Sequence, residues 1–397
     1  MTTDEIKSYI YSFDGYDIRE NHDCRYVDQK CTPDIVCFIS DCILSSKCAN
    51  EEFTVQDLWH QNYFVENCRV IFGKPSPEDP KTKNEYNKVL VQPLKLLAYA
   101  HVLDVRKDRK LYFKVHNNEL LEYISIKERN AFNFLLIFFK KVLQDSGFWR
   151  YFEQYEQDCK EDPRGAKATI YEKYHRFIAA NTPTKKDLDA IRMFHKVFNL
   201  FAYSKGLPGS DGELLEWYDL MYNRVNWRDK DRKQKSETRK ESKSAEQKRI
   251  NQEFYITYNI NKAIKLVRKM QGDVSEVHSD DWQIVKATEV HHIFPRSKFP
   301  TIATRFENLI LLTSSQHHTK AHPNGNTQLI NKEYQLICLL AKSNTIETYI
   351  KEINKGFYQK ESFIYVINTG LSEEQIDDGN ISFDGIRKYL IHYYQAH

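Results

Sequence analysis

Apolar residues recur at helical spacing along most of this chain, and strand-like patterns are few and short. Residues 117–223 carry aromatic and aliphatic side chains three and four positions apart, which predicts buried helices. The most apolar run, AFNFLLIFFKKVL at 131–143, is too short to cross a bilayer and predicts a core helix. TPDIVCFISDCIL at 32–44 predicts another helix, with Thr32 as its N-cap and Pro33 in its first turn. We therefore expect a predominantly helical α+β fold.

A different pattern precedes that helical stretch. FTVQDLWHQNYF at 53–64 predicts a short helix, and a longer helical segment with an apolar stripe follows at 79–103. After it, DVRK and LYFKV predict two strands joined by a charged turn at Lys107 and Asp108. This order of helix, helix and hairpin resembles a winged helix-turn-helix. An ordinary helical subdomain that ends in a hairpin is the alternative.

The winged-helix resemblance implies which side chains would contact DNA. Asn and Gln suit the edges of adenine, and Arg and Lys suit guanine and phosphates. The candidates are Asn84, Lys88, Gln92 and Lys95 on the second helix, and Lys107, Arg109 and Lys110 at the wing.

Strand-like patterns return in the last third of the chain. WQIVKATEVHHIFP at 282–295 has the β-branched content of a strand, and NLILLT at 308–313 predicts a second one. SSQHHTKAH at 314–322 predicts a helix, capped by Thr313 or Ser314 and ended by Pro323. The order is thus strand, loop, strand and helix, with histidines at the end of the first strand and on the helix.

This arrangement resembles the HNH, or ββα-metal, nuclease family over roughly residues 284–323. The resemblance rests on the pair His291–His292 with Ile293 and Pro295 after it, on Asn308 at the start of N-L-x-L-L, and on His317 nine positions further. Neutral imidazole can accept a proton near pH 7 and can also bind a divalent metal, which suits phosphodiester hydrolysis.

The family register implies a role for each of these residues. His292 would be the general base, His291 and His317 would be metal ligands, and Asn308 would orient the loop that carries the base. Glu289 would brace a ligand histidine. The ion would be divalent, Mg²⁺ in the first place, with Mn²⁺ or another transition metal as alternatives.

The helix register leaves one ambiguity. His317 has the family spacing from Asn308, yet His318 and His322 form an i,i+4 pair on one face of an α-helix. We therefore take His317 as the ligand and keep His318 and His322 as secondary candidates. Three basic side chains flank the site and are candidates for phosphate contacts: Arg296, Lys298 and Lys320.

Charge and composition narrow the classes of function. The chain has 397 residues and a formal net charge of +3, so any affinity for nucleic acid must come from local patches. Its N-terminus, MTTDEIKSYIYSF, has no basic segment followed by an apolar one, so we expect a cytoplasmic protein without a membrane anchor. None of the eight cysteines forms a C-x-x-C pair, and we expect reduced thiols.

The expected organisation follows from these patterns. Residues 228–249 hold ten basic and five acidic side chains and almost nothing apolar, which marks a boundary as a solvated helix or a linker. The expected regions are 1–116, with the winged helix at about 53–116; a helical domain at 117–227; the charged linker at 228–249; and an HNH nuclease domain with a helical extension at 250–397.

Recognition ahead of cleavage resembles a Type II restriction endonuclease, a class that includes the Type IIS enzymes, which cut outside their site. That resemblance implies sequence-specific hydrolysis of double-stranded DNA, with a homodimer for double-strand cleavage. The alternatives are an HNH nuclease of another role, such as a methylation-dependent, phage or homing enzyme, and a non-catalytic winged-helix regulator.

Overall fold

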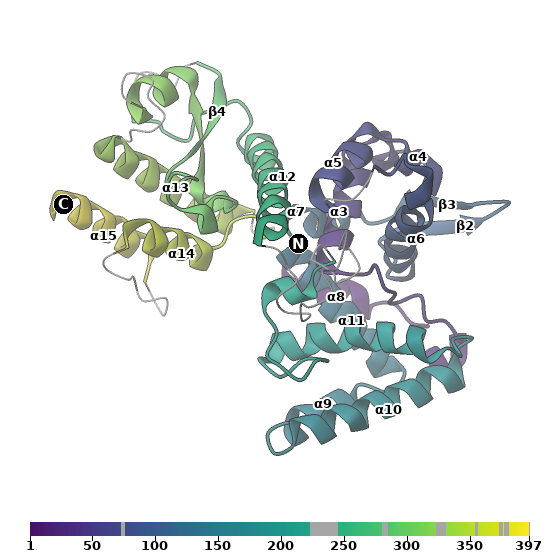
Figure 1. The fold of residues 1–397 in the computed structure, drawn as a ribbon. Coiled ribbons are helices and arrows are strands. Elements are labelled where there is room, and N and C mark those ends of the chain that lie inside the picture. Colours follow the sequence, from purple (N-terminus) through teal and green to yellow (C-terminus); the bar gives the residue numbers. More distant parts are fainter. Residues whose placement is uncertain are drawn as a thin grey trace. The chain divides into compact units, whose positions relative to one another are not determined.

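The computed structural model describes most of the chain (Figure 1): residues 1–72, 76–222, 245–279, 285–322, 331–353, 356–372, 376 and 381–396. Contacts divide the chain into two compact units, which we call unit 1 (Met1–Asn251) and unit 2 (Gln252–His397). Within the described residues, helices predominate and two small antiparallel sheets accompany them, so the predicted helical α+β class is confirmed.

The core of unit 1 forms around α3 (Pro33–Leu44), which is buried along almost its whole length. It packs against α7 (Asn118–Ile126) and α8 (Glu128–Asp145), and α1 (Thr3–Tyr11) also lies on α8. The helices predicted at 32–44 and 131–143 are therefore confirmed as core helices. Because α3 shares its core with α7 and α8, the predicted regions 1–116 and 117–227 pack as one body.

Further helices complete the described part of unit 1. They are α2 (Ile18–Asn21), α9 (Arg150–Asp158), α10 (Pro163–Asn181) and α11 (Asp187–Lys205). Figure 1 shows α9, α10 and α11 side by side, and α10 packs against both of the others. Their contacts are largely aromatic, as the apolar spacing of 117–223 predicted.

The segment from 53 to 115 contains the predicted hairpin and one more strand. Its elements are β1 (Phe53–Thr54), α4 (Val55–Trp59), α5 (Asn62–Phe72), α6 (Lys83–Tyr99), β2 (Leu103–Lys107) and β3 (Leu111–Val115). All three strands pair antiparallel in the order β1-β3-β2. The hairpin is confirmed, but its turn lies later than predicted, because Lys107 still pairs with Leu111 and residues 108–110 make the turn.

The single helix predicted at 53–64 is wrong in one respect, since two helices meet there. Thr54 does cap α4, where its side chain accepts a hydrogen bond from the Asp57 amide. The helix then ends because the Gln61 side-chain amide donates to the Asp57 carbonyl at 3.0 Å, the acceptor that a continuing helix would need.

Unit 2 holds the second sheet, three helices of its own and most of α12 (Ala245–Gln271) among the described residues. Its other elements are β4 (Ala287–His292), β5 (Leu309–Thr313), a π-helical turn (Gln316–Ala321), α13 (Lys332–Glu352), α14 (Lys360–Leu371) and α15 (Phe383–Ala396). Every residue of β5 is buried. The strand predicted at 282–295 is thus shorter than expected, although residues 282–284 lie outside the described part.

A buried ion pair ties α13 to the sheet of unit 2. The Lys342 ammonium donates to both carboxylate oxygens of Glu276, at 3.2 and 2.9 Å, and to the Tyr358 hydroxyl at 2.8 Å. The same carboxylate accepts a hydrogen bond from the Leu311 amide of β5. Both buried charges have hydrogen-bond partners, so neither is left unpaired, which would be costly. The pair therefore fixes the position of α13 against β5.

Two further expectations concern the boundary and the membrane. Most of the predicted linker, residues 228–244, lies outside the described part of the chain, and residues 245–249 begin α12. Within the part that is described, no helix has the length and apolar character needed to cross a membrane.

Candidate metal and catalytic site

The antiparallel pairing of β4 and β5 positions the two adjacent histidines. His291 pairs with Ile310 and His292 with Leu309, where β4 ends and β5 begins. Both imidazoles line the same cleft in unit 2, with a volume of about 540 Å³. Neighbouring side chains of a regular strand point to opposite faces, but His292 stands at the last paired position, where the chain leaves the sheet, and both imidazoles reach the cleft.

The helical segment after β5 decides which other histidines join them. Its N-terminus is capped reciprocally, since Thr313 Oγ1 accepts from the Gln316 amide and Gln316 Oε1 accepts from the Thr313 amide. The segment then forms a single π-helical turn, in which the His322 amide donates to the His317 carbonyl at 3.1 Å. A bond from i+5 to i brings His317 and His322 to the same side.

This turn corrects the α-helical register assumed from the sequence. The i,i+4 pairing of His318 with His322 does not form, because the backbone bond spans five residues and the turn is wider than in an α-helix. His322 is buried and faces the cluster, whereas His318 is exposed. The pair on the inner side is therefore His317 and His322.

Three imidazoles converge in the cleft: those of His291, His317 and His322. Their ring centroids lie 5.2, 4.9 and 4.9 Å apart, and one nitrogen of each ring lies within 4.8 Å of one nitrogen of the other two. Nδ1 of His317 is buried and has no hydrogen-bond partner. Such a cluster of imidazole nitrogens, one of them unsatisfied, is the arrangement that a divalent metal ion needs.

The surroundings keep two of these imidazoles, those of His291 and His317, neutral. Burial holds the pKa of His291 well below its usual range, and His317 and His322 lower it further. Burial also lowers the pKa of His317 to about 4, and His322 and His318 act in the same direction. Because only a neutral imidazole has a lone pair to give to a metal, His291 and His317 are ready to bind one at neutral pH.

His292 is held in a different way from its neighbour. Its Nε2 lies 3.0 Å from the carbonyl oxygen of Ala303. A carbonyl oxygen only accepts hydrogen bonds, so Nε2 carries the proton and Nδ1 keeps a lone pair. Burial lowers the pKa of His292, and the nearby charge of Arg296 adds to that effect. The ring is thus a neutral base whose orientation is set by one backbone group.

Asn308 fixes the loop that supplies this backbone group. It is fully buried, and its side chain accepts from the Phe294 amide at 2.9 Å. It also donates to the carbonyls of Phe294 and Ile302, at 3.0 and 3.3 Å. Ile302 directly precedes Ala303, whose carbonyl binds His292. The asparagine therefore positions the base through the loop.

Two glutamines that the sequence analysis did not single out complete this support. Gln335 of α13 donates to the Ile293 carbonyl at 2.7 Å, next to His292 in the chain. Gln316 accepts from Ser275 Oγ at 2.6 Å and donates to the Val277 carbonyl at 3.1 Å, which ties the π-helical turn to the preceding segment. Each is an isolated Gln in a helical pattern, so only its hydrogen bonds in the folded chain reveal the role.

Of the remaining predicted residues, some line the cleft or lie beside its histidines and others do not. Arg296 lines it and donates to Thr257 Oγ1 of α12 at 3.2 Å, whereas the exposed Lys298 and Lys320 are not among its lining residues. Glu289 is half-buried and forms a second group with His317 and His318, whose ligand atoms lie within 4.8 Å of one another. The predicted bracing role of Glu289 thus has the required proximity to His317.

The candidate residues for DNA contacts in unit 1 differ in how far their side chains are exposed to solvent. Asn84 and Lys88 on α6 are exposed, but Gln92 is half-buried, and its side chain accepts from the Lys30 amide at 2.9 Å. Lys95 lines a small cavity in the same unit. The three basic residues of the wing are all exposed at the hairpin tip: Lys107, Arg109 and Lys110.

Comparison of the chain with protein-family models, with curated proteins and with solved structures found no match. The geometry of the site must therefore carry any conclusion about function.

Proposed function

We propose that this chain is a metal-dependent endonuclease of the HNH type that hydrolyses double-stranded DNA, most similar to a Type II restriction endonuclease. One observation carries the proposal. A neutral imidazole with a free lone pair, His292, lines the same cleft as three converging imidazoles. A structural cluster of histidines would not need a separate, oriented base beside it.

The residues of the cluster suit a metal ion, and their chemistry favours one kind. His291, His317 and His322 would hold it. If His317 coordinates through Nδ1, the metal gives this buried atom the partner that it lacks. Three imidazole nitrogens suit Zn²⁺, Co²⁺ or Ni²⁺, whereas Mg²⁺ and Mn²⁺ prefer oxygen ligands. We therefore propose a transition metal in place of the Mg²⁺ expected first from the sequence.

The side chains around the cluster can then take separate roles in the hydrolysis of the phosphodiester bond. Nδ1 of His292 takes a proton from the attacking water, because Nε2 is already committed to the Ala303 carbonyl. The guanidinium of Arg296, at the mouth of the same cleft, can pair with a backbone phosphate. A bound metal would supply charge stabilisation on the phosphate and the leaving oxygen.

DNA recognition is proposed for unit 1. The helix α3, the short strand β1, the helices α4 to α6 and the hairpin β2–β3 follow one another in the order of a winged helix, and β1 pairs with β3. The exposed tip with Lys107, Arg109 and Lys110 is the wing. This topology supports a DNA-binding role and favours a restriction enzyme over a nuclease that lacks a recognition region.

The test is digestion of plasmid DNA by the purified full chain with Mn²⁺, Zn²⁺, Co²⁺, Ni²⁺ or Mg²⁺, followed by sequencing of the ends. We expect metal-dependent breaks at a defined site. His292→Ala should lower the cleavage rate about 10²–10⁴-fold, the usual cost of losing a general base, with DNA binding within a few-fold. His278→Ala, an exposed histidine of the same unit that does not line the cleft, is the control. Cleavage by His292→Ala at the wild-type rate would remove the proposed base.

A further inference from the structure

Helix α14 lies outside the segment that the sequence connects with the site, yet it contacts the loop that orients the base. We call residues 294–308, between β4 and β5, the base loop. This loop supplies the Ala303 carbonyl, 3.0 Å from Nε2 of His292. Among the described residues, that carbonyl is the only hydrogen-bond partner of the His292 ring. The orientation of the ring therefore depends on where the base loop lies.

A buried carboxylate fixes the C-terminal end of the base loop to α14. Glu307 is only 2% exposed and directly precedes Asn308. Its Oε1 accepts from the Gln359 amide at 3.0 Å, and its Oε2 accepts from the Ser362 hydroxyl at 2.9 Å. Both donors stand at the N-terminus of α14, where the helix dipole also favours a negative charge. Because an unpartnered buried carboxylate is costly, these contacts hold the loop in place.

The N-terminal end of the base loop rests against the other end of α14. The buried Phe294 has its amide and its carbonyl bound by Asn308. Its ring lies so close to Gly370 that a Cβ at that position would overlap the ring atoms. The same ring packs edge to face against Phe299, with centroids 5.6 Å apart. The absence of a side chain at Gly370 is therefore what lets α14 approach this ring.

Two further contacts join the base loop to α14 and the residues before it. Phe306 stacks on Phe357, with ring centroids 4.4 Å apart, and the Arg305 guanidinium lies 5.1 Å from the centroid of the Tyr365 ring. Ala303 lies between the two held ends of the loop and is fully buried. The position of its carbonyl thus follows from how α14 holds the loop.

We propose that α14 is part of the catalytic apparatus, and that Ser362 and Gly370 are positioning residues for the base. Through Glu307 and Phe294 they hold the base loop, which keeps the Ala303 carbonyl where Nε2 of His292 donates to it. Nδ1 is then the nitrogen available to the attacking water. The role in catalysis rests on the proposed function, whereas the coupling of α14 to the His292 ring does not.

The test follows the Nε2 proton of His292 by NMR in the purified full chain, labelled with ¹⁵N-histidine. A buried, hydrogen-bonded proton exchanges slowly with water, because the hydrogen bond must first open. We expect a protected imidazole N–H signal that disappears in His292→Ala. A wild-type chain without such a signal would overturn the proposal.

Ser362→Ala leaves Oε2 of Glu307 buried without its donor. We expect the Nε2 proton of His292 to exchange at least about tenfold faster, and the cleavage rate to fall at least about tenfold, since small displacements of a catalytic group are costly. Affinity for Zn²⁺ should stay within about threefold, because the ligand histidines lie on β4 and the π-helical turn and keep their own supports.

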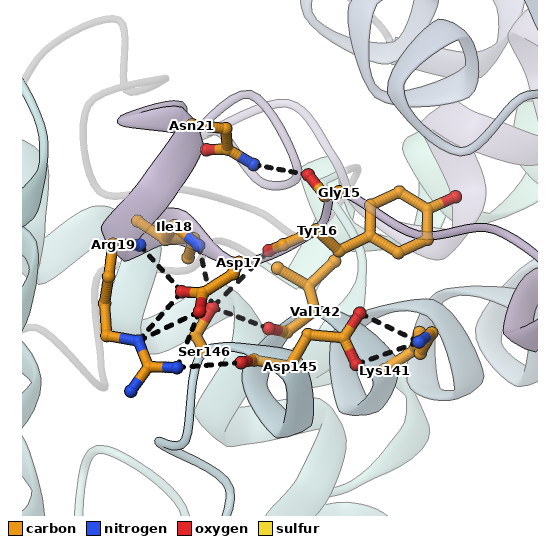
Figure 2. Close-up of polar contacts among 10 residues, drawn as sticks. All are labelled: Gly15, Tyr16, Asp17, Ile18, Arg19, Asn21, Lys141, Val142, Asp145 and Ser146. Carbon is orange, nitrogen blue, oxygen red and sulfur yellow. Dashed lines mark hydrogen bonds and ion pairs between the residues drawn. The ribbon is translucent and has the colours of Figure 1, made fainter.

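Ser146→Ala is the matched control, a second buried serine that fastens a segment to a helix. Figure 2 shows its hydroxyl in unit 1, where it accepts from the Ile18 amide at 3.0 Å and donates to the Val142 carbonyl at 2.7 Å. Loss of these bonds should lower the melting temperature. Exchange of the His292 proton should stay at the wild-type rate, because Ser146 does not contact the base loop.

Gly370→Ala presses on the Phe294 ring from the other end of α14. We expect the same two changes as in Ser362→Ala. Adding Phe294→Leu to this chain should reverse part of both, because the smaller side chain makes room for the methyl group. Gly385→Ala is the control in the same unit, since its methyl group would meet the Ile381 side chain beside α15, and it should change neither.

The outcomes separate this proposal from the proposed nuclease. If Ser362→Ala and Gly370→Ala exchange the proton at the wild-type rate, or if the two controls accelerate exchange as much, α14 does not position the base. Ser362→Ala decides alone if Gly370→Ala does not fold. Faster exchange with wild-type cleavage would also overturn the positioning role. Faster exchange in a chain that cuts DNA with no metal tested would refute the nuclease and leave the coupling of α14 to His292 intact.

Discussion

At the scale of residues, four histidines near the cleft should separate into two groups. His291, His317 and His322 converge, whereas His318 is exposed beside them. We expect His317→Ala and His322→Ala each to lose more than about 100-fold in affinity for Zn²⁺ or Co²⁺, a larger loss than removal of a supporting residue causes. His318→Ala should stay within about threefold.

Calorimetric titration of the four proteins with Co²⁺ measures this, and the visible spectrum of bound Co²⁺ reports the ligand set. If His318→Ala loses the metal while His322→Ala keeps it, the π-helical register is wrong. The α-helical pairing of His318 with His322 would then be the better description.

Asn308 acts through hydrogen bonds to a loop, so its loss should affect folding and catalysis together. Asn308→Ala leaves the Phe294 amide and carbonyl and the Ile302 carbonyl without their partner in a buried place. We expect unfolding free energy to fall by about 2–4 kcal/mol. Metal affinity should change little, because the ligands lie on β4 and the π-helical turn, and the cleavage rate should fall at least about 100-fold.

Asn368→Ala is the control for this prediction. Its side chain also clamps a loop, donating to the Ile376 carbonyl at 3.1 Å and accepting from the Ile376 amide at 2.8 Å, but it does not line the cleft. Urea unfolding followed by circular dichroism should show a loss of stability in both variants. If Asn308→Ala and Asn368→Ala both keep the wild-type cleavage rate, the role of Asn308 is only structural.

At the scale of elements, the hairpin β2–β3 carries exposed charge at its tip, away from its buried residues Leu103 and Phe113. Its three basic residues lie at the tip, and phosphate contacts release counterions from DNA. We expect the triple change of Lys107, Arg109 and Lys110 to Ala to weaken DNA binding at least about tenfold. The slope of log affinity against log salt should become shallower by up to about 2.7, or about 0.9 for each phosphate contact.

Fluorescence anisotropy of the full chain with labelled duplexes at several salt concentrations gives both quantities. The matched control changes three exposed basic residues elsewhere in unit 1: Lys160, Arg164 and Lys186. An equal loss of affinity in the control would mean that net charge, not the wing, attracts the DNA.

At the scale of the whole molecule, the two compact units suggest separate tasks. The described contacts divide the chain at Asn251 and Gln252, and the candidate nuclease cleft lies wholly within unit 2. We expect a fragment of residues 1–227 to bind a specific duplex without cutting it, at least about 4 kcal/mol more tightly than random DNA. A fragment of residues 245–397, which keeps α12 whole, should bind metal and cut DNA without sequence preference.

Anisotropy, calorimetry and digestion of both fragments measure these properties. Sequence preference in the fragment of residues 245–397 alone would place recognition in the nuclease half. Failure of both fragments to fold would show that the units depend on each other.

Much of the candidate site could be predicted from the sequence because its parts are local. Strand, loop and strand are encoded by alternation and β-branched content over residues 287–313, and Asn308 stands between them. The helices at 32–44 and 131–143 were equally clear, since an apolar face of regular period defines a core helix. Local patterning thus determined the predominantly helical class, the hairpin and the order of the chemistry-bearing residues.

Only the tertiary structure decided which histidines meet. The π-helical turn is held by Gln316, whose partners at Ser275 and Val277 lie about forty positions earlier, and no local pattern reveals such contacts. The same holds for the small cavity of unit 1 that Lys95 lines, which draws residues 14–16, Arg25, part of α6 and the hairpin to one place. Propensity and periodicity act over a few residues, whereas burial and the pairing of polar groups depend on packing across the whole chain, so the sequence determined the residue types and the fold determined their geometry.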